Sequence, residues 1–274
     1  MNYHSDKWIM DKVQEHYQEA LELYPADRII GIFCQGSQNY GLDYEGSDVD
    51  TKCFLVPTLE DIIFNKKPIS TTYIRANEEH IDFKDIRLFL STVRKQNLNF
   101  MEILFTKYKI VNPTYEQYWN RLVENNEQIA RYNPVGAVKT MKGIAMEKYH
   151  AMEHRYPSKV ELIDKYGYDP KQLSHLIRVR EYLSRYIKGE AYADCLQTRI
   201  ARHLVFVKRT DKLYYSLNDA REVAEEELRL VTKMSDEFAA AHKDDPVDWH
   251  VDILLDDVQR DIVKLGIELE LEKG

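Results

Sequence analysis

The stretch from residue 36 to residue 50 restricts the fold more than any other part of the sequence. An apolar, β-branched run from Arg28 to Cys34 comes before it, and a second strand-like run covers residues 49–56. Gly36 lets the backbone approach a ligand closely, and Ser37 adds a hydroxyl donor. N–H groups exposed at a turn from strand to helix suit phosphate oxygens. The sequence therefore predicts a sheet with a turn that binds an anionic ligand.

Two carboxylates follow at the end of this stretch. Asp48 and Asp50 are two positions apart, so on a strand both side chains project from one face. Neighbouring carboxylates repel each other and are tolerated where a cation neutralises them. Hard oxygen ligands favour Mg²⁺ or Mn²⁺. The competing interpretation is a solvent-facing pair on an acidic protein.

Gly36-Ser37, ten intervening residues and then Asp48-x-Asp50 resemble the signature of the DNA polymerase beta superfamily of nucleotidyltransferases. The resemblance implies a third acidic residue on a later strand, and Asp82 in Ile81-Asp82-Phe83 matches it best. Asp85 is the rival, but it stands where a helix cap is expected. The three aspartates are then the expected catalytic and metal-binding residues.

Further blocks are similar to predicted nucleotidyltransferases associated with an RNA repair pathway. They are Tyr40-Gly41-Leu42, Ser47-Asp48, Arg87-x-Phe89-Leu90, residues 99–105 and Lys171-x-x-x-His175-x-x-Arg178. The matches run from about residue 30 to residue 190. Asn99-Phe100 departs from the Asn-Pro that this group often has, which affects a loop.

The resemblance implies transfer of a nucleoside monophosphate from a nucleoside triphosphate to an acceptor hydroxyl, by a two-metal mechanism. Asp82 is then on the acceptor side and could also take the hydroxyl proton. The residues expected at the nucleotide are Gly36, Ser37, Tyr40, Ser47, Lys139, Lys142, Lys171, His175 and Arg178. Ordinary surface charge is an open alternative for each of the cationic ones.

The order of predicted elements indicates an α+β fold. Strands are expected over residues 28–34, 49–56, 71–75 and 80–83, with helices over 6–22 and 85–94. From residue 113 on, the pattern is helical, over roughly 114–131, 134–155, 169–187, 191–207, 218–242 and 248–265. We therefore expect a mixed-sheet nucleotidyltransferase domain over residues 1–112 and a helical domain over 113–274.

The net charge of −8 hides a basic segment. Residues 171–212 contain ten lysines and arginines and four acidic residues, with tyrosines between them. Such a segment attracts phosphates, which makes an RNA 3′ end, or another nucleic acid, the expected acceptor. A solvated helix surface with core tyrosines would have the same composition.

Three other functions stay open. The acceptor could be a protein or a small molecule, or the chain could be an inactive nucleotide- or RNA-binding module. His150-Ala151-Met152-Glu153-His154 fits a zinc-peptidase pattern, but no third ligand follows at a convincing position. With three separated cysteines, no signal peptide and no long apolar run, we expect a cytoplasmic protein without a membrane partner.

Overall fold

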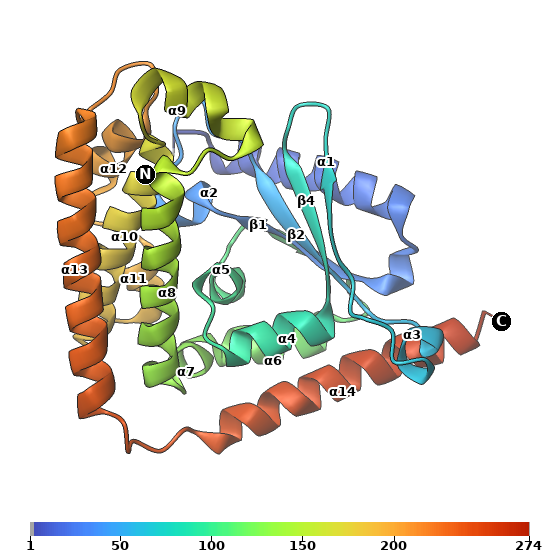
Figure 1. Cartoon of the computed structure of the whole chain (residues 1–274). Helices are drawn as coiled ribbons and strands as arrows, with labels where there is room; N and C mark the ends of the chain where they lie inside the picture. The colour runs from blue at the N-terminus through green and yellow to red at the C-terminus, as the bar shows by residue number, and fades with distance from the viewer. Residues whose placement is uncertain (1–2, 274) are drawn as a thin grey trace. The chain divides into compact units, whose positions relative to one another are not determined.

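The computed structural model describes residues 3–273 (Figure 1). The chain forms two compact units. The first contains residues 1–133 together with 247–274, and the second contains residues 134–246.

The first unit is built on a five-stranded mixed sheet. The strands are β1 (Ile29–Gln35), β2 (Asp50–Leu55), β3 (Ser70–Ile74), β4 (His80–Asp85) and β5 (Lys109–Val111), in the spatial order β3-β4-β2-β1-β5. β2 and β4 are parallel, and the other neighbouring pairs are antiparallel. The strand that carries Asp50 and the strand that carries Asp82 are therefore direct neighbours with the same direction.

One face of the sheet packs on α1 (Asp6–Leu23), which begins after the Ser5 cap. Alternate residues of each strand point to this face because side chains along a strand alternate between the two sides. Its core joins Ile9, Val13 and Ala20 of α1 to Ile32, Cys34, Cys53, Leu55, Ile81 and Phe83 of the strands, all buried. This face is closed by apolar contacts.

The opposite face is apolar at one end. Phe33 of β1 and Phe54 of β2 pack with Phe89 of α4 (Ile86–Arg94) and Trp119 of α6 (Glu116–Glu124). Trp119 and Phe54 lie 5.7 Å apart between ring centroids. The same face carries polar side chains further along β2 and β4, and these form the candidate site.

The remaining elements of this unit are short, apart from the last helix. They are η1 (Ala26–Arg28), α2 (Ser37–Tyr40), α3 (Leu59–Ile63), α5 (Leu98–Met101), η2 (Glu102–Leu104), α7 (Asn126–Arg131) and α14 (Trp249–Leu271). α14 returns to this unit after the second one. Its Asp256 pairs with Arg94 of α4 at 2.5 Å, and its Asp261 pairs with Arg121 of α6 at 2.8 Å.

The second unit is helical. Its elements are α8 (Pro134–Glu153), η3 (Pro157–Lys159), α9 (Val160–Tyr166), α10 (Pro170–Tyr186), α11 (Tyr192–Leu196), α12 (Ala201–Lys208) and α13 (Leu217–Ala241). Buried serine hydroxyls hold helices together: Ser235 of α13 donates to the Val138 carbonyl of α8 at 2.8 Å, and Ser174 of α10 donates to the Leu204 carbonyl of α12 at 2.9 Å.

The expected α+β class is confirmed by the mixed sheet and the many helices. All four expected strands are present, whereas β5 and α5 were not expected because three or four residues carry too little periodicity. The helix predicted over 114–131 is two helices. Asn125 separates them, since its amide donates to the Arg121 carbonyl at 2.8 Å and ends α6. The helix predicted over 191–207 is likewise divided into α11 and α12.

The expected domain boundary at residue 112 stays a prediction, and α6, α7 and α14 pack within the first compact unit. Within residues 3–273, no helix combines the length and the apolar character that a membrane span requires.

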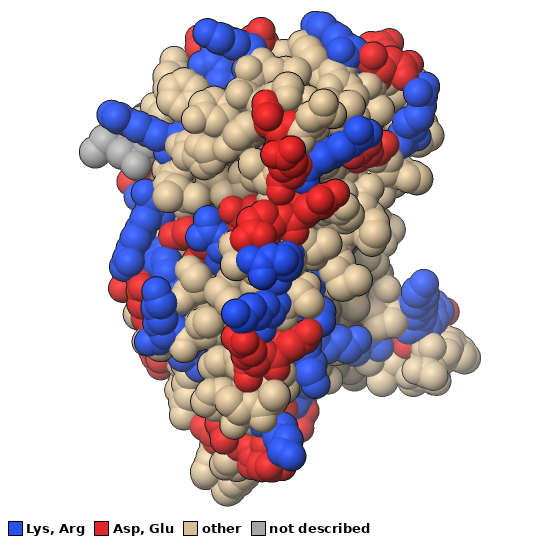
Figure 2. All heavy atoms as spheres, turned by 60° about the vertical axis from the view of Figure 1, so that its left-hand side comes forward, with Lys and Arg blue, Asp and Glu red and all other residues tan. Residues whose placement is uncertain are grey.

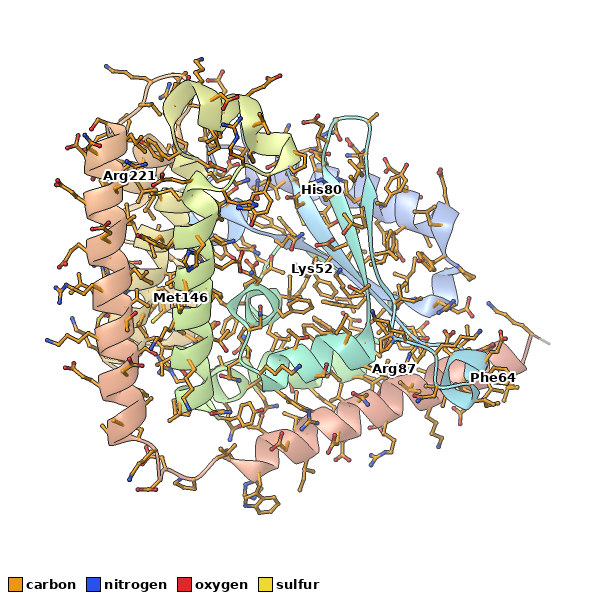
Figure 3. All side chains as sticks on the ribbon, in the orientation of Figure 1. Lys52, Phe64, His80, Arg87, Met146 and Arg221 are labelled. Atoms are coloured by element: carbon orange, nitrogen blue, oxygen red, sulfur yellow. The ribbon has the colours of Figure 1, made fainter. Side chains whose placement is uncertain are left out.

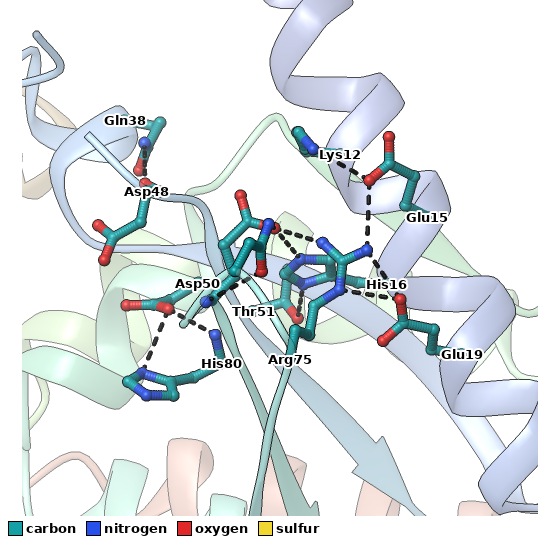
Figure 4. Close-up of polar contacts among 12 residues, drawn as sticks. Lys12, Glu15, His16, Glu19, Gln38, Asp48, Asp50, Thr51, Arg75 and His80 are labelled. Atoms are coloured by element: carbon teal, nitrogen blue, oxygen red, sulfur yellow. Dashed lines mark hydrogen bonds and ion pairs between the residues drawn. The ribbon is translucent and has the colours of Figure 1, made fainter. Parts of the chain in front are cut away.

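A buried polar network fastens α1 to the β3–β4 hairpin (Figure 4). His16 of α1 is fully buried, with Nδ1 2.9 Å from the Thr51 hydroxyl and Nε2 3.1 Å from the Glu79 carboxylate. Arg75 pairs with the same carboxylate and, at 2.7 Å, with Glu19 of α1. Removing one member of such a network leaves buried partners without a hydrogen bond.

Glu79 therefore links stability to pH. Burial alone would raise the pKa of Glu79, but hydrogen bonds from His16 and Asn77 outweigh it and lower the pKa to about 2. A carboxyl with a lowered folded-state pKa stabilises the fold above its unfolded pKa and loses this effect as pH falls through the folded pKa. We expect Glu79→Gln to reduce the free energy of unfolding at pH 7 by about 2 kcal/mol. This reduction should become smaller as the pH falls towards 2.

Urea denaturation at pH 7, 4.5 and 3 measures this difference, where 4.5 is the ordinary pKa of a glutamate. The exposed neighbour Glu78 serves as the control, as Glu78→Gln. A Glu79→Gln effect that is equal at all three pH values would contradict the assignment.

Candidate functional site

The turn after β1 has the backbone that the sequence predicted. Gly36 has φ 87° and ψ −140°, a conformation that favours glycine, and α2 begins at Ser37. A Cβ added to Gly36 would meet no atom within 4 Å, so the space beside it is open. The Gly36 N–H donates to a carboxylate oxygen of Glu102 at 3.3 Å. This amide, which the sequence assigned to a phosphate, therefore has a protein partner.

Glu102 is a site residue that sequence reasoning missed. It is 2% exposed and also accepts from the Asn39 amide at 3.2 Å. The Asn39 carbonyl oxygen in turn accepts from the Thr106 hydroxyl at 2.7 Å. This buried network holds the turn in place from η2. A glutamate within the apolar run 100–105 was the available signal, since a buried charge needs hydrogen-bond partners.

The loop between the turn and β2 is tied down by Gln38. Its amide donates to the Asp48 carbonyl at 2.7 Å, and its carbonyl oxygen accepts from the Ser37 hydroxyl at 3.3 Å. Tyr40 is 4% exposed and therefore belongs to the core of the loop. The Ser47 hydroxyl accepts from the Tyr44 N–H at 3.0 Å, within a turn. Tyr40 and Ser47 therefore stabilise the loop, in addition to the nucleotide contact that the sequence predicts for them.

Asp48 and Asp50 lie on either side of the start of β2. The strand begins at Asp50, so Asp48 is in the preceding loop, where it is exposed. One Asp50 carboxylate oxygen accepts from the His80 backbone N–H at 2.8 Å and lies 3.4 Å from its imidazole Nδ1. In Figure 4, both carboxylates lie on the side of the sheet away from α1.

Asp82 belongs to the same face, on the neighbouring strand. The parallel register places Asp82 beside Lys52, and Gln35 of β1 beside Asp50. The carboxylate accepts from the Thr72 hydroxyl at 2.5 Å and from the Gln35 amide at 3.2 Å. Burial alone would raise the pKa of Asp82, but these hydrogen bonds and two nearby lysines lower it.

Asp85, the rival third carboxylate, caps a helix as expected. It accepts from the Arg87 N–H at 2.8 Å at the start of α4, and it also pairs with the Arg87 side chain. Its side chain points to the α1 face by register, because it alternates with Lys84 on β4. The geometry therefore favours Asp82 over Asp85.

Lys52 is a second residue that sequence reasoning missed. Figure 3 shows it on the sheet below His80. Its side chain is 5% exposed, and its ammonium group lies 3.9 Å from Asp82 and 5.2 Å from the centre of the Phe100 ring of α5. Burial lowers the pKa of Lys52, and the carboxylates of Glu102, Asp82 and Asp50 oppose this. Its position two residues after Asp50 was the available signal.

The donor chemistry of this face fits a hard divalent cation at one end. Asp48 and Asp50 offer carboxylate oxygens, the ligands that Mg²⁺ prefers. Among residues 3–273, no three acidic, histidine or cysteine side chains form a ready-made metal centre. The oxygens of Asp82 are instead close to hydrogen-bond donors and ammonium groups.

The cationic residues expected at the nucleotide all belong to the second unit. Lys171, His175 and Arg178 follow one another on α10 with helical spacing, and Arg178 is 4% exposed. Burial, and then the charges of Arg178 and Lys171, lower the pKa of His175 to about 3. On α8, Lys139 is exposed, whereas Lys142 pairs with Asp236 of α13 at 2.8 Å.

Several basic residues of the segment 171–212 have carboxylate partners. Arg180 pairs with Glu227 at 2.6 Å, and Arg185, which is 5% exposed, pairs with Glu190 at 2.9 Å. Arg199 and Arg209 are also in ion pairs. Figure 2 brings the side of α13 forward and shows basic and acidic side chains interspersed on it. The charge excess of the sequence is therefore reduced in the fold.

The tyrosines within this segment are buried, and one that follows it is exposed. Tyr182, Tyr186 and Tyr192 are at most 3% exposed and pack on one another, with ring centroids 5.6–6.2 Å apart. They are core residues, so they cannot form a surface on which nucleic-acid bases stack. Tyr214 is 53% exposed.

The zinc-peptidase pattern does not form its expected geometry. α8 ends at Glu153, and His154 lies beyond the helix. Both Glu153 carboxylate oxygens accept from Arg221 of α13, at 2.9 and 2.6 Å. The two histidines are therefore not presented on one helical turn with a free glutamate between them.

No protein-family model matches the chain, and no curated protein matches it. Among solved structures, the chain is similar to a nucleotidyltransferase-like protein from Exiguobacterium sibiricum 255-15. The identity is 12%, the match covers 85% of this chain and 77% of that one, and the TM-score is 0.30. A likeness at this level does not identify a family.

The Gly36 backbone generates a stability prediction. Because a Cβ at Gly36 meets open space, the cost of Gly36→Ala is conformational, and we expect a loss of about 1–2 kcal/mol. Gly143, inside α8, also has open space around a Cβ. Gly143→Ala should stabilise the protein by about 0.5–1 kcal/mol, because alanine is the better helix former. Chemical denaturation of both variants checks the opposite signs.

Proposed function

We propose that this protein is a metal-dependent nucleotidyltransferase that transfers a nucleoside monophosphate from a nucleoside triphosphate to an acceptor hydroxyl. The observation that carries the proposal is the position of Asp50 and Asp82 on one face of adjacent parallel strands. The Gly36-Ser37 turn follows β1, the strand on the other side of β2. Two carboxylates and the Gly36-Ser37 turn then share one end of the sheet, as the reaction requires.

The acceptor oxygen attacks the α-phosphorus, and the bond to the β-phosphate breaks to release pyrophosphate. Asp48 and Asp50 would hold Mg²⁺ or Mn²⁺, with Asp82 on the acceptor side as the sequence predicts. The cations supply neutralisation of the triphosphate charge in a two-metal arrangement. The lowered pKa of Asp82 makes this carboxylate a weaker base than an ordinary aspartate, and it stays the proposed acceptor of the hydroxyl proton.

Glu102 and Asn39 position the Gly36-Ser37 turn, and Gln38 fixes the loop that leads to Asp48. Most of the catalysis in this proposal is positioning and charge neutralisation. Lys139, Lys142, Lys171 and His175 remain the proposed contacts to nucleotide or acceptor phosphates, whereas Arg178 is buried.

Labelled triphosphates test the reaction class. Each of the four α-labelled ribonucleoside triphosphates is incubated with the protein and Mg²⁺, with RNA, DNA, protein or an aminoglycoside-like small molecule as acceptor. Transfer of label to any acceptor supports the proposal. If label is bound but never transferred, the protein is a nucleotide-binding module.

We expect Asp48→Ala and Asp50→Asn each to reduce transfer by at least about a hundredfold, because each removes a cation ligand. Asparagine at position 50 can still accept the hydrogen bond from the His80 N–H, which protects the fold. Asp11→Asn, an exposed change on α1, is the control. Initial rates with saturating triphosphate measure the effect, and activity within tenfold of wild type in either variant would refute the metal-site assignment.

We propose an RNA 3′ end as the acceptor, supported by the exposed Lys188, Arg202 and Lys212 and by the resemblance to RNA-repair-associated proteins. Replacing Arg178 and Arg185 is a poor test because both are buried. Changing the three exposed residues together to glutamine should weaken RNA binding. The dependence of log affinity on log salt should flatten by about one unit for each phosphate that the variant no longer neutralises.

Fluorescence anisotropy with labelled RNA between low and physiological salt measures these slopes. Arg229→Gln with Lys233→Gln, two exposed changes on α13, is the matched control. RNA binding that is independent of salt, or transfer only to a protein or small molecule, would refute the RNA acceptor and leave nucleotidyl transfer standing.

A further inference from the structure

Lys52 stands beside Asp82 in the middle of the candidate site. The two residues face each other across the parallel β2–β4 pair, and the ammonium nitrogen lies 3.9 Å from Asp82 Oδ2. The Lys52 side chain is 5% exposed, and Phe100 of α5 lies against its ammonium group. A side chain in such a position cannot turn away into water, so its ammonium group stays beside the neighbouring carboxylate.

The Gln35 side chain holds both charges in place. Its carbonyl oxygen accepts from the Lys52 ammonium, and its amide donates to Asp82 Oδ2 at 3.2 Å. One amide thus fixes the lysine and the carboxylate at once, and the orientation of the amide is set by the two groups together. Sequence reasoning could not have found this bridge, because Gln35 and Asp82 come from different strands.

Each Asp82 oxygen has a hydrogen-bond donor and an ammonium group near it. Oδ2 has Gln35 and Lys52, whereas Oδ1 has the Thr72 hydroxyl at 2.5 Å and the Lys84 ammonium at 3.9 Å. One Asp50 oxygen has the backbone N–H and the imidazole of His80 near it, and the Lys52 charge also acts on this carboxylate. Asp48 is exposed before the strand begins. The three carboxylates are therefore not equivalent.

We propose that Lys52 neutralises Asp82, so that the nucleotide-free protein binds one divalent cation, at Asp48 and Asp50, and none at Asp82. The inference rests on the proposed function and deepens it. A cation that approached Asp82 would have to overcome the fixed charge of Lys52 at short range, in a buried place where solvent screens little. The second cation of the proposed reaction would then enter with the triphosphate.

Binding of Mn²⁺ without nucleotide tests this, by electron paramagnetic resonance of the free ion and by calorimetry. The wild type should bind one Mn²⁺ per chain. Asp50→Asn should weaken that binding by at least about tenfold, whereas Asp82→Asn should leave it within about threefold. Thermal unfolding of each variant, followed by circular dichroism, shows that the fold is kept.

Lys52→Met is the decisive variant, because methionine fills a similar volume beside Phe100 without a charge. It should create a second Mn²⁺ site at Asp82. The affinity of this site should be at least about tenfold higher than any affinity of Asp82 for Mn²⁺ in the wild type. The site should be absent from the Lys52→Met, Asp82→Asn double variant. Lys109→Met is the matched control: Lys109 lies in the same cross-strand row beside Phe33, but on β5, with β1 and β2 between it and β4.

Two results would overturn the inference. One is that Asp82→Asn weakens Mn²⁺ binding, relative to the wild type, as much as Asp50→Asn does. The other is a Lys52→Met variant that gains no site. Failure of the proposed function looks different: the labelled-triphosphate reaction shows no transfer with any acceptor, whereas Lys52→Met still gains its Asp82-dependent site.

Discussion

The pairing of β2 with its two neighbours is the constraint on which the first unit depends. β2 is antiparallel to β1 and parallel to β4, with Gln35 beside Asp50 on one side and Asp82 beside Lys52 on the other. A slip of β2 by one residue would send Asp50 and Lys52 to the apolar face that packs on α1. The buried apolar residues of that face, such as Cys53 and Ile81, forbid the slip. The core therefore sets the register, and the register assembles the site.

The charged side chains on the polar face of the sheet are held by partners within the fold. Charged groups that lose water must gain partners, and aspartates on neighbouring strands would otherwise repel one another. Lys52 and the Gln35 amide supply these partners from within the sheet itself. Glu102 does the same from η2 for the Gly36-Ser37 turn. The site is thus held by side chains that belong to rigid elements, which is the arrangement that precise positioning of a triphosphate needs.

The second unit uses charge differently. Arg185 is buried, with Glu181 and Glu190 as partners, and donates to the backbone carbonyls of Gln197 and Asp194 at 2.7 Å each. It fastens α10 to the segment after it, and its charge is neutralised on the spot. A local excess of basic residues in a sequence overstates the surface charge, because some arginines are buried in ion pairs of this kind. The exposed lysines of the segment carry the charge that a phosphate backbone could meet.

The α+β class, the four longer strands, the Asp85 cap and the turn at Gly36 could all be predicted from the sequence. Each of these depends on local chemistry: periodicity, side chains that cap a helix, and a glycine where φ is positive. The sequence also singled out Asp48, Asp50 and Asp82, whose roles stay predictions. What surrounds these aspartates became visible only in the folded chain. Lys52, Gln35 and Glu102 reach the site through strand register and packing between elements far apart in the chain, and no local pattern encodes which residues such packing brings together.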